Sequence, residues 1–222
     1  MKRLIAFVLM VMIISISTLS LAEFDMDIYI NNDNYSFIRD DFTGNTAIRV
    51  KRHISYMDNY ITGSLLQVVP IIGIYGSNQS DPMMMLEFSF EFTSWLFIDE
   101  IIVLVDGMEG STKYTFTNLD VSRQVTEYGI KESFFIYLTD SSFPIFDAIV
   151  DNGLNKTSNV RIRLVGRDTV WDTSLTIYNK YQDKKTNAAF AQSFIMLRDD
   201  YIKAGGLERD FSLYRKFDPK IN

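Results

Sequence analysis

The alternation of apolar and polar residues is clearest between Met83 and Thr93. The apolar positions in this stretch are Leu86, Phe88, Phe90 and Phe92, and the polar positions between them are Glu87, Ser89, Glu91 and Thr93. A period of two predicts a strand with one face in a core and the other face in water. Residues 101–105 form an unbroken apolar run, which is typical of a strand covered on both faces. The sequence therefore predicts a core built from β-strands.

Shorter alternating runs recur along the chain, and we expect further strands at 26–30, 35–38, 46–57, 65–69, 71–75, 113–117, 133–138, 160–164 and 171–177. Three hairpins are expected: 26–30 with 35–38, 99–105 with 113–117, and 160–164 with 171–177. Pro70 cannot donate a hydrogen bond to a neighbouring strand, so it predicts an edge, a bulge or a bend. The polar residues 118–126 predict an irregular connection.

Two stretches have the period of an amphipathic helix. The first, at about 142–152, follows serines that can cap free N–H groups and has Pro144 in its first turn, where a proline costs no hydrogen bond. The second, at about 187–204, has apolar residues at spacings of four, three and four: Phe190, Phe194, Leu197 and Tyr201. Gly153 and Gly205 follow these stretches and predict where the helices end.

These elements predict a mainly β fold, between all-β and α+β. We expect an antiparallel β-sandwich or an open barrel of about nine or ten strands, with two helices. Residues 23–222 are long enough to bury a core and show no internal boundary with enough strands on both sides of it. They predict a single domain that follows a signal peptide at residues 1–22.

The N-terminal stretch has the three parts of a secretory signal peptide. Lys2 and Arg3 are basic, residues 4–16 are apolar apart from Ser15, and residues 20–22 (Ser-Leu-Ala) place small side chains at a cleavage site. The apolar run is shorter than the roughly 20 residues that a bilayer-spanning helix needs. We therefore expect cleavage after Ala22, no stable membrane span in the mature chain, and a periplasmic or extracellular location.

Charge and cysteine content narrow the class further. Loss of Lys2 and Arg3 with the signal peptide takes the formal net charge from −6 to −8, and such a field repels nucleic acid. The chain contains no cysteine, so it lacks the disulfides that oxidising compartments permit. This combination is more typical of a bacterial exported protein than of a eukaryotic ectodomain.

Basic residues supply the candidate binding site. Arg161 and Arg163 project from one face of their predicted strand, and a second basic cluster lies at 49–52. If the two strands were neighbours, one patch would contain Arg49, Lys51, Arg52, Arg161 and Arg163, which suits a carboxylate, a phosphate or a sulfated glycan. The alternative is cross-strand pairing of these cations with the carboxylates of Glu87 and Glu91 on a solvated sheet face.

The remaining reactive residue types have simple structural explanations. His53 is the only histidine, lies on the polar side of its strand and is expected at the surface. Asp99 and Glu100 are explained by a tight turn, although a carboxylate raised in pKa within a cleft would suggest acid catalysis. Residues 83–85 are three methionines, which we interpret as fillers of a core. We expect no metal site and no cofactor, because neither cysteines nor histidine pairs are present.

The sequence favours an exported, non-enzymatic binding or structural protein of the cell envelope. Its expected partner is an envelope protein or a small ligand, and not nucleic acid. Two alternatives stay open. One is a hydrolase that uses two carboxylates, as glycoside hydrolases do. The other is a carrier that uses some of the 17 Phe, 12 Tyr and 2 Trp residues to line a cavity for an apolar molecule.

Overall fold

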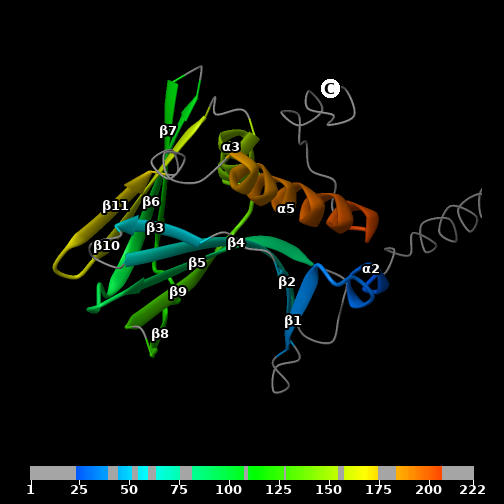
Figure 1. Ribbon diagram of the computed structural model, residues 1–222, viewed down its shortest axis with the longest axis horizontal. Coiled ribbons are helices and arrows are strands. Elements are labelled where there is room, and N and C mark those ends of the chain that lie inside the picture. The colour runs from blue at the N-terminus through cyan, green and yellow to red at the C-terminus, as the bar shows by residue number, and fades with distance from the viewer. Residues whose placement is uncertain are drawn as a thin grey trace, which may run out of the picture.

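The computed structural model describes residues 24–39, 45–51, 55–59, 64–75, 82–107, 110–127, 129–154, 158–174 and 184–206. Within these ranges the chain forms two antiparallel sheets and three helices (Figure 1). The predicted mainly β, antiparallel fold with two substantial helices is therefore confirmed.

The larger sheet has seven strands in the order β1-β2-β4-β5-β9-β8, with β3 also paired to β4. It curls into a half-barrel. Its strands are β1 (Tyr35–Arg39), β2 (Thr46–Val50), β3 (Ser55–Asn59), β4 (Ser64–Ile74), β5 (Met83–Phe92), β8 (Ser122–Val125) and β9 (Ile130–Tyr137). The smaller sheet has four strands in the order β11-β10-β6-β7. They are β6 (Ile98–Gly107), β7 (Gly110–Thr117), β10 (Asn159–Gly166) and β11 (Val170–Ser174).

Two long helices fill the space between the sheets. The helix α3 (Phe143–Leu154) packs against β6 and β10 of the smaller sheet, and α5 (Lys184–Lys203) packs against β4 of the larger sheet and against α3 (Figure 1). At the other end the sheets touch directly, because the rings of Phe90 and Trp171 lie 4.7 Å apart between centroids. The sheets thus form a wedge whose open side is closed by the helices.

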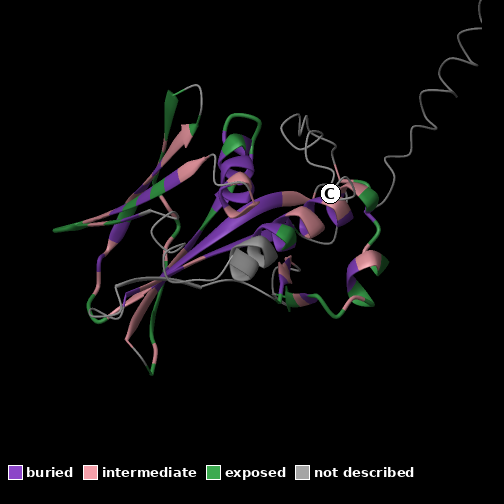
Figure 2. Ribbon diagram, turned by 45° about the horizontal axis from the view of Figure 1, so that its top comes forward, coloured by how far each residue is buried: buried purple, intermediate pink, exposed green. Residues whose placement is uncertain are grey.

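A continuous core joins both sheets and both long helices (Figure 2). Phe88 and Phe134 are directly opposite each other on β5 and β9, and their rings are stacked 5.5 Å apart between centroids. Phe146 of α3 meets Phe194 of α5 at 5.2 Å. The apolar residues that the alternation placed on the core side of β9 and β10 are buried: Phe134, Ile136, Val160, Ile162 and Leu164.

The predicted first strand is wrong, because residues 27–30 form the short helix α2 (Asp27–Ile30). The side chain of Asp25 accepts a hydrogen bond from the N–H of Asp27 at 3.0 Å, which starts a turn instead of an extended chain. Tyr29 is then fully buried between the rings of Phe24 and Tyr35. Consequently β1 has no hairpin partner at 26–30 and pairs with β2.

The predicted long strand at 46–57 exists as two strands, β2 and β3, which both pair with β4. The predicted interruption of β4 at Pro70 is wrong, since β4 runs without a break from Ser64 to Ile74 and Pro70 pairs with Leu86 of β5. Among the described residues, none pairs with residues 68–70 of β4 on the side of β2 and β3. Within the described structure Pro70 therefore lies at a local edge, one of the three positions predicted for it, where a residue without an N–H is tolerated.

Two expectations about exposed faces also need correction. Glu87 and Ser89, on the predicted water face of β5, are buried, and Glu87 forms an ion pair there with Arg49 of β2. In the apolar run 101–105, only Ile101 and Val103 are fully buried. Ile102 is half-buried on the outer face of the smaller sheet, so this strand is covered on one face and not on both.

Local connections complete the comparison. The hairpins β6–β7 and β10–β11 form as predicted. Residues 122–125, expected to be irregular, form the edge strand β8. Asp99 and Glu100 lie inside β6 and not in a turn, since the chain changes direction earlier, at residues 93–97. The predicted helices at about 142–152 and 187–204 correspond to α3 and α5.

Candidate functional site

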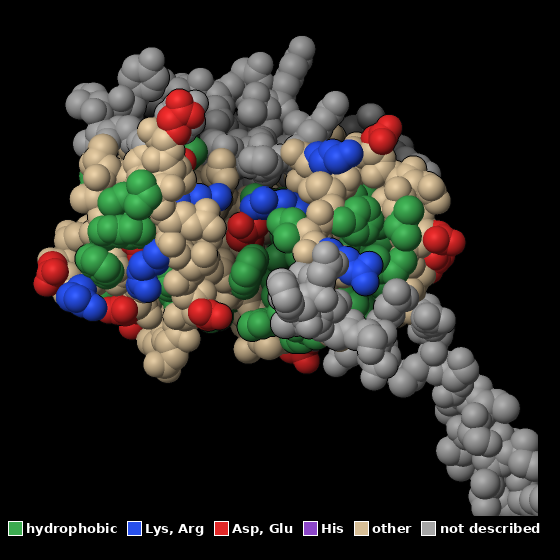
Figure 3. Space-filling model, turned by 90° about the horizontal axis from the view of Figure 1, so that it is seen from below, with side chains coloured by type: hydrophobic (Ala, Val, Ile, Leu, Met, Phe, Trp, Pro, Cys, Tyr) green, Lys and Arg blue, Asp and Glu red, His purple; other side chains and the backbone are tan. Residues whose placement is uncertain are grey.

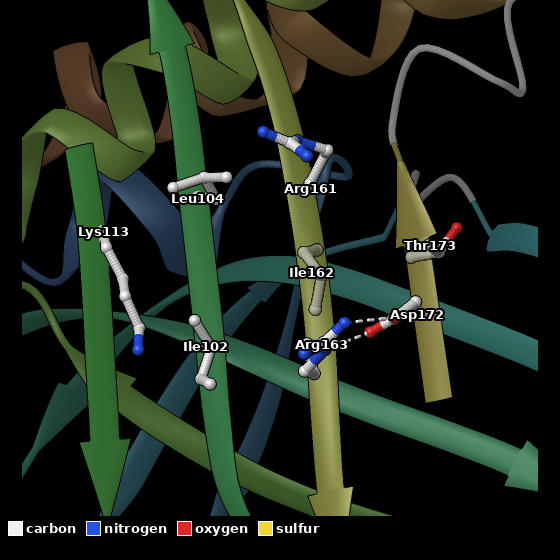
Figure 4. A pocket seen from close by; sticks show the side chains of 8 residues that line it. All are labelled: Ile102, Leu104, Lys113, Arg161, Ile162, Arg163, Asp172 and Thr173. Atoms are coloured by element: carbon white, nitrogen blue, oxygen red, sulfur yellow. Dashed lines mark hydrogen bonds and ion pairs between the residues drawn. The ribbon is translucent and has the colours of Figure 1, made fainter. Parts of the chain in front are cut away.

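A hollow of about 430 Å³ lies on the outer face of the smaller sheet (Figure 4). This volume is within the range of ordinary small-molecule sites. All four strands of the sheet contribute to its lining, which comprises Ile102, Leu104, Lys113, Arg161, Ile162, Arg163, Asp172 and Thr173.

The register of the strands explains this combination of side chains. Arg161 of β10 is opposite Leu104 of β6, which is in turn opposite Lys113 of β7. One step along, Arg163 is opposite Ile102. Because alternate residues of a strand point to the same face, these five side chains share the outer face. The result is an apolar floor of two half-buried aliphatic residues with cations on both sides.

Two of the cations are held by carboxylates. Arg163 donates two hydrogen bonds to Asp172 on β11, at 2.6 and 2.8 Å (Figure 4). Arg161 donates two to Asp106 on β6, at 3.0 and 3.1 Å. The hydrogen bond from Arg163 lowers the pKa of Asp172, and hydrogen bonds from Ser111 and Arg161 lower the pKa of Asp106. Both acids are therefore ionised at neutral pH and fix the guanidinium groups in place.

Lys113 differs from the two arginines. Its side chain is exposed, and it forms no ion pair in the part of the chain that the structure describes. In the close view its ammonium group extends along the sheet toward the level of Ile102 (Figure 4). The hollow therefore contains a cation without a counter-ion beside an apolar floor.

The structure brings together two of the five basic residues predicted to form a patch. Arg161 and Arg163 line the hollow, whereas Arg49 lies on β2 in the other sheet and forms an ion pair with Glu87. Lys51 is exposed just after β2, and Arg52 lies outside the described residues. The alternative prediction, that the cations pair with glutamates across strands, is therefore correct for Arg49. The two arginines of β10 pair with aspartates instead.

The sequence did not single out the other residues of the hollow, although signals for two of them were present. The predicted hairpin at 160–164 and 171–177 sets Asp172 opposite Arg163. The predicted hairpin at 99–105 and 113–117 sets Lys113 opposite Leu104. Because the strand at 101–105 was predicted to be covered on both faces, the sequence did not indicate that Ile102 contributes to an exposed apolar surface.

Of the other candidate residues, the structure describes the methionines, whereas His53 lies outside the described residues. Met84 is buried in the main core, and Met85 is buried on the opposite face of the larger sheet with Val69 and Ile71. Among the described residues, no group of three His, Cys, Asp or Glu side chains is arranged to hold a metal ion.

One acid has a strongly raised pKa, but it is remote from the hollow. Asp147 lies on α3, where burial raises the pKa of its carboxyl to about 7 against the opposing effect of Arg198 on α5. It is almost fully buried and does not line the hollow. Among the described lining residues the one carboxylate is that of Asp172, which already receives two hydrogen bonds from Arg163. The described lining of the hollow thus combines an apolar floor, two carboxylate-bound arginines and Lys113.

Comparison of the chain with known protein families, curated proteins and solved structures found no match. In the described part of the chain, no helix has both the length and the apolar character required to cross a bilayer.

Proposed function

We propose that this protein is a non-enzymatic binding protein whose ligand occupies the hollow on the outer face of the smaller sheet. The observation that carries this proposal is the placement of uncompensated Lys113 beside the apolar floor of Ile102 and Leu104. Contact with such a floor contributes roughly 25 cal/mol for each Å² of apolar surface removed from water. The ligand class that fits is a small anion, a carboxylate, phosphate or sulfate, attached to an apolar group.

The two arginines support the same ligand class. Their hydrogen bonds to the aspartates use Nε and Nη2, which leaves Nη1 of both Arg161 and Arg163 available to an incoming anion within the described structure. Because Asp106 and Asp172 hold the guanidinium planes, little side-chain freedom is lost when the ligand binds. The aspartates also reduce the net positive charge of the site, which favours a singly charged ligand over a polyanion.

Dodecanoate, used below its micelle concentration, is the probe for this proposal. We expect isothermal titration calorimetry to show binding to the purified protein, and we expect Lys113→Gln to weaken it about tenfold, which corresponds to ~1.4 kcal/mol. Lys131→Gln is the matched control, since it removes the same charge from β9 of the other sheet. Absence of binding, or an equal loss in both variants, would reject the hollow as the site.

We further propose that the protein is exported and that residues 1–22 are removed. The basic start, the short apolar run and the small residues before Glu23 support this proposal. When the full chain is expressed in a bacterium, the intact mass of the protein in the periplasmic or external fraction should correspond to a chain that begins at Glu23. Leu9→Arg puts a charge into the apolar run and should leave the uncleaved chain inside the cell. An uncleaved wild-type chain in the cytosol would contradict export.

A further inference from the structure

The strand β9 is covered along only half of one edge. β8 pairs with residues 130–133 of β9, and the pairing ends at Ser133 opposite Ser122 (Figure 1). The remaining half, residues 134–137, continues beside β5 on its other edge. In the described part of the chain, four residues of an otherwise paired strand therefore have a free side.

The hydrogen-bonding phase of β9 identifies which backbone groups face that side. The N–H of Leu138 donates to the carbonyl oxygen of Met84 at 3.0 Å, so the chain position opposite Met84 is hydrogen-bonded to β5. In an antiparallel ladder, hydrogen-bonded and non-hydrogen-bonded positions alternate. Ile136 and Phe134 therefore bond to β5, and Phe135 and Tyr137 direct their N–H and C=O groups away from it.

One of these outward groups already has a partner. The hydroxyl of Ser142 donates to the carbonyl oxygen of Tyr137 at 3.1 Å. Among the described residues, the N–H groups of Phe135 and Tyr137 and the carbonyl of Phe135 have no protein partner. In chain order these groups are a donor at Phe135, an acceptor at Phe135 and a donor at Tyr137, which is the pattern that a neighbouring extended strand would pair with.

This free edge lacks the usual protection against pairing. Edge strands are normally blunted by charged residues, proline or a bulge. Residues 134–137 are Phe-Phe-Ile-Tyr, and their pairing with β5 shows no bulge. Phe135 and Tyr137 are 47% and 46% exposed on the outer face of the larger sheet. Seen from below, hydrophobic side chains gather on that face beside a few charged ones (Figure 3).

A groove of about 400 Å³ runs along the free edge. Its opposite wall comes from the end of β7 and the link to β8, with Phe116 and Leu119 as apolar contacts and Asp120 as an exposed acid. Hydroxyl groups of Thr139, Ser141 and Ser142 close one end, and no basic side chain is among the described residues that line the groove. Its polarity therefore complements a segment that carries positive charge.

We propose that this edge of β9 binds an extended peptide segment of a partner protein, which adds as a strand beside Phe135 and Tyr137. Unpaired backbone groups at two-residue spacing match an extended peptide, and strand addition to an open sheet edge is an established mode of peptide recognition. Apolar residues of the segment pack against the exposed aromatic rings and against Phe116, and a lysine or arginine lies beside Asp120. The site is independent of the hollow on the smaller sheet.

The probe is a fluorescein-labelled peptide, Lys-Val-Thr-Val-Thr-Val-Lys with blocked ends, and binding is followed by fluorescence polarisation. Phe135→Pro removes the outward N–H of Phe135 and leaves the ladder to β5 intact, because that N–H is not used there. Phe135→Thr removes the ring but keeps the N–H and a β-branched side chain. We expect the proline variant to bind at least tenfold more weakly than the threonine variant. Circular dichroism verifies that both remain folded.

A second peptide, N-methylated at alternate residues on its pairing edge, separates backbone pairing from side-chain contact. We expect it not to bind, and we expect the parent peptide to slow hydrogen exchange at the amides of Phe135 and Tyr137. Equal binding of both peptides, or failure of the parent peptide and of versions with leucine or tyrosine in place of valine, would overturn the proposal. So would a concentration-dependent dimer that Phe135→Pro abolishes, since a second copy would then be the occupant.

Discussion

Replacing Glu132 with glutamine is expected to lower the free energy of unfolding by about 3 kcal/mol or more. Glu132 is 1% exposed, and its carboxylate accepts the backbone N–H groups of Leu96, Phe97 and Ile98 at 2.7, 2.8 and 2.9 Å. Nε of Arg123 adds a fourth hydrogen bond at 3.2 Å. A glutamine amide keeps one acceptor oxygen and puts an NH₂ group against two donors, whichever way it is turned.

The position of these bonds makes the expected loss large. Residues 93–97 connect β5 of one sheet to β6 of the other, so Glu132 on β9 ties this crossing segment to the larger sheet. Phe97 has a φ of 53°, which is unfavourable for a bulky residue and must be held by its surroundings. Its ring lies beneath the guanidinium groups of Arg123 and Arg167, at 5.7 and 5.0 Å from the centroid.

Urea unfolding followed by circular dichroism and tryptophan fluorescence measures the effect. Glu100→Gln is the matched control, because Glu100 is a half-buried glutamate on β6 whose side chain makes no hydrogen bond in the described structure. We expect Glu100→Gln to change the free energy of unfolding by no more than about 0.5 kcal/mol, which is typical of a surface substitution. Equal midpoints for the wild type and Glu132→Gln would show that the carboxylate is not needed to hold the crossing segment.

Local periodicity predicted most of the strands and helices correctly. It failed where contacts with residues distant in the sequence determine the local structure. The period of two located β9 and β10 because Phe134 and Val160 begin clean alternations toward the core. It failed at residues 27–30, where burial of Tyr29 and the turn at Asp25 favour a helix. It also divided β4 into two strands at Pro70, whereas the strand is continuous and the proline lies at a local edge.

The candidate site was predictable to the extent that hairpins define it. Register within a hairpin follows from the turn, so the Arg163–Asp172 pair was accessible from the sequence. The order of strands in a sheet follows from no local pattern, and the sequence therefore could not show that Arg49 and Arg161 belong to different sheets. The sequence does contain a signal for Glu132. This glutamate lies two residues before Phe134 and therefore shares the core-facing side of β9, where a charged side chain needs buried hydrogen-bond partners.

The same crossing segment predicts a second large effect, at Gly166. This glycine ends β10 beside an irregularity in its pairing with β6, opposite Ile98. A Cβ atom added there would come closer than 3.0 Å to the carbonyl oxygen of Leu96, a distance that real Cβ atoms do not show. The obstacle is backbone, and Glu132 fixes that backbone through the N–H of Leu96. No rotamer change relieves the clash, so Gly166→Ala is expected to cost about 3 kcal/mol.

Gly107→Ala is the control for this prediction, because Gly107 ends the adjacent strand β6 and no atom of the described structure lies within 4 Å of the Cβ it would acquire. Both substitutions add one methyl group and restrict the unfolded chain equally, so their difference in unfolding free energy isolates the contact with Leu96. We expect Gly107→Ala to unfold at a urea concentration close to that of the wild type. If Gly166→Ala did the same, residues 95–97 would be able to move away from β10, and the hydrogen bonds to Glu132 would not be holding them.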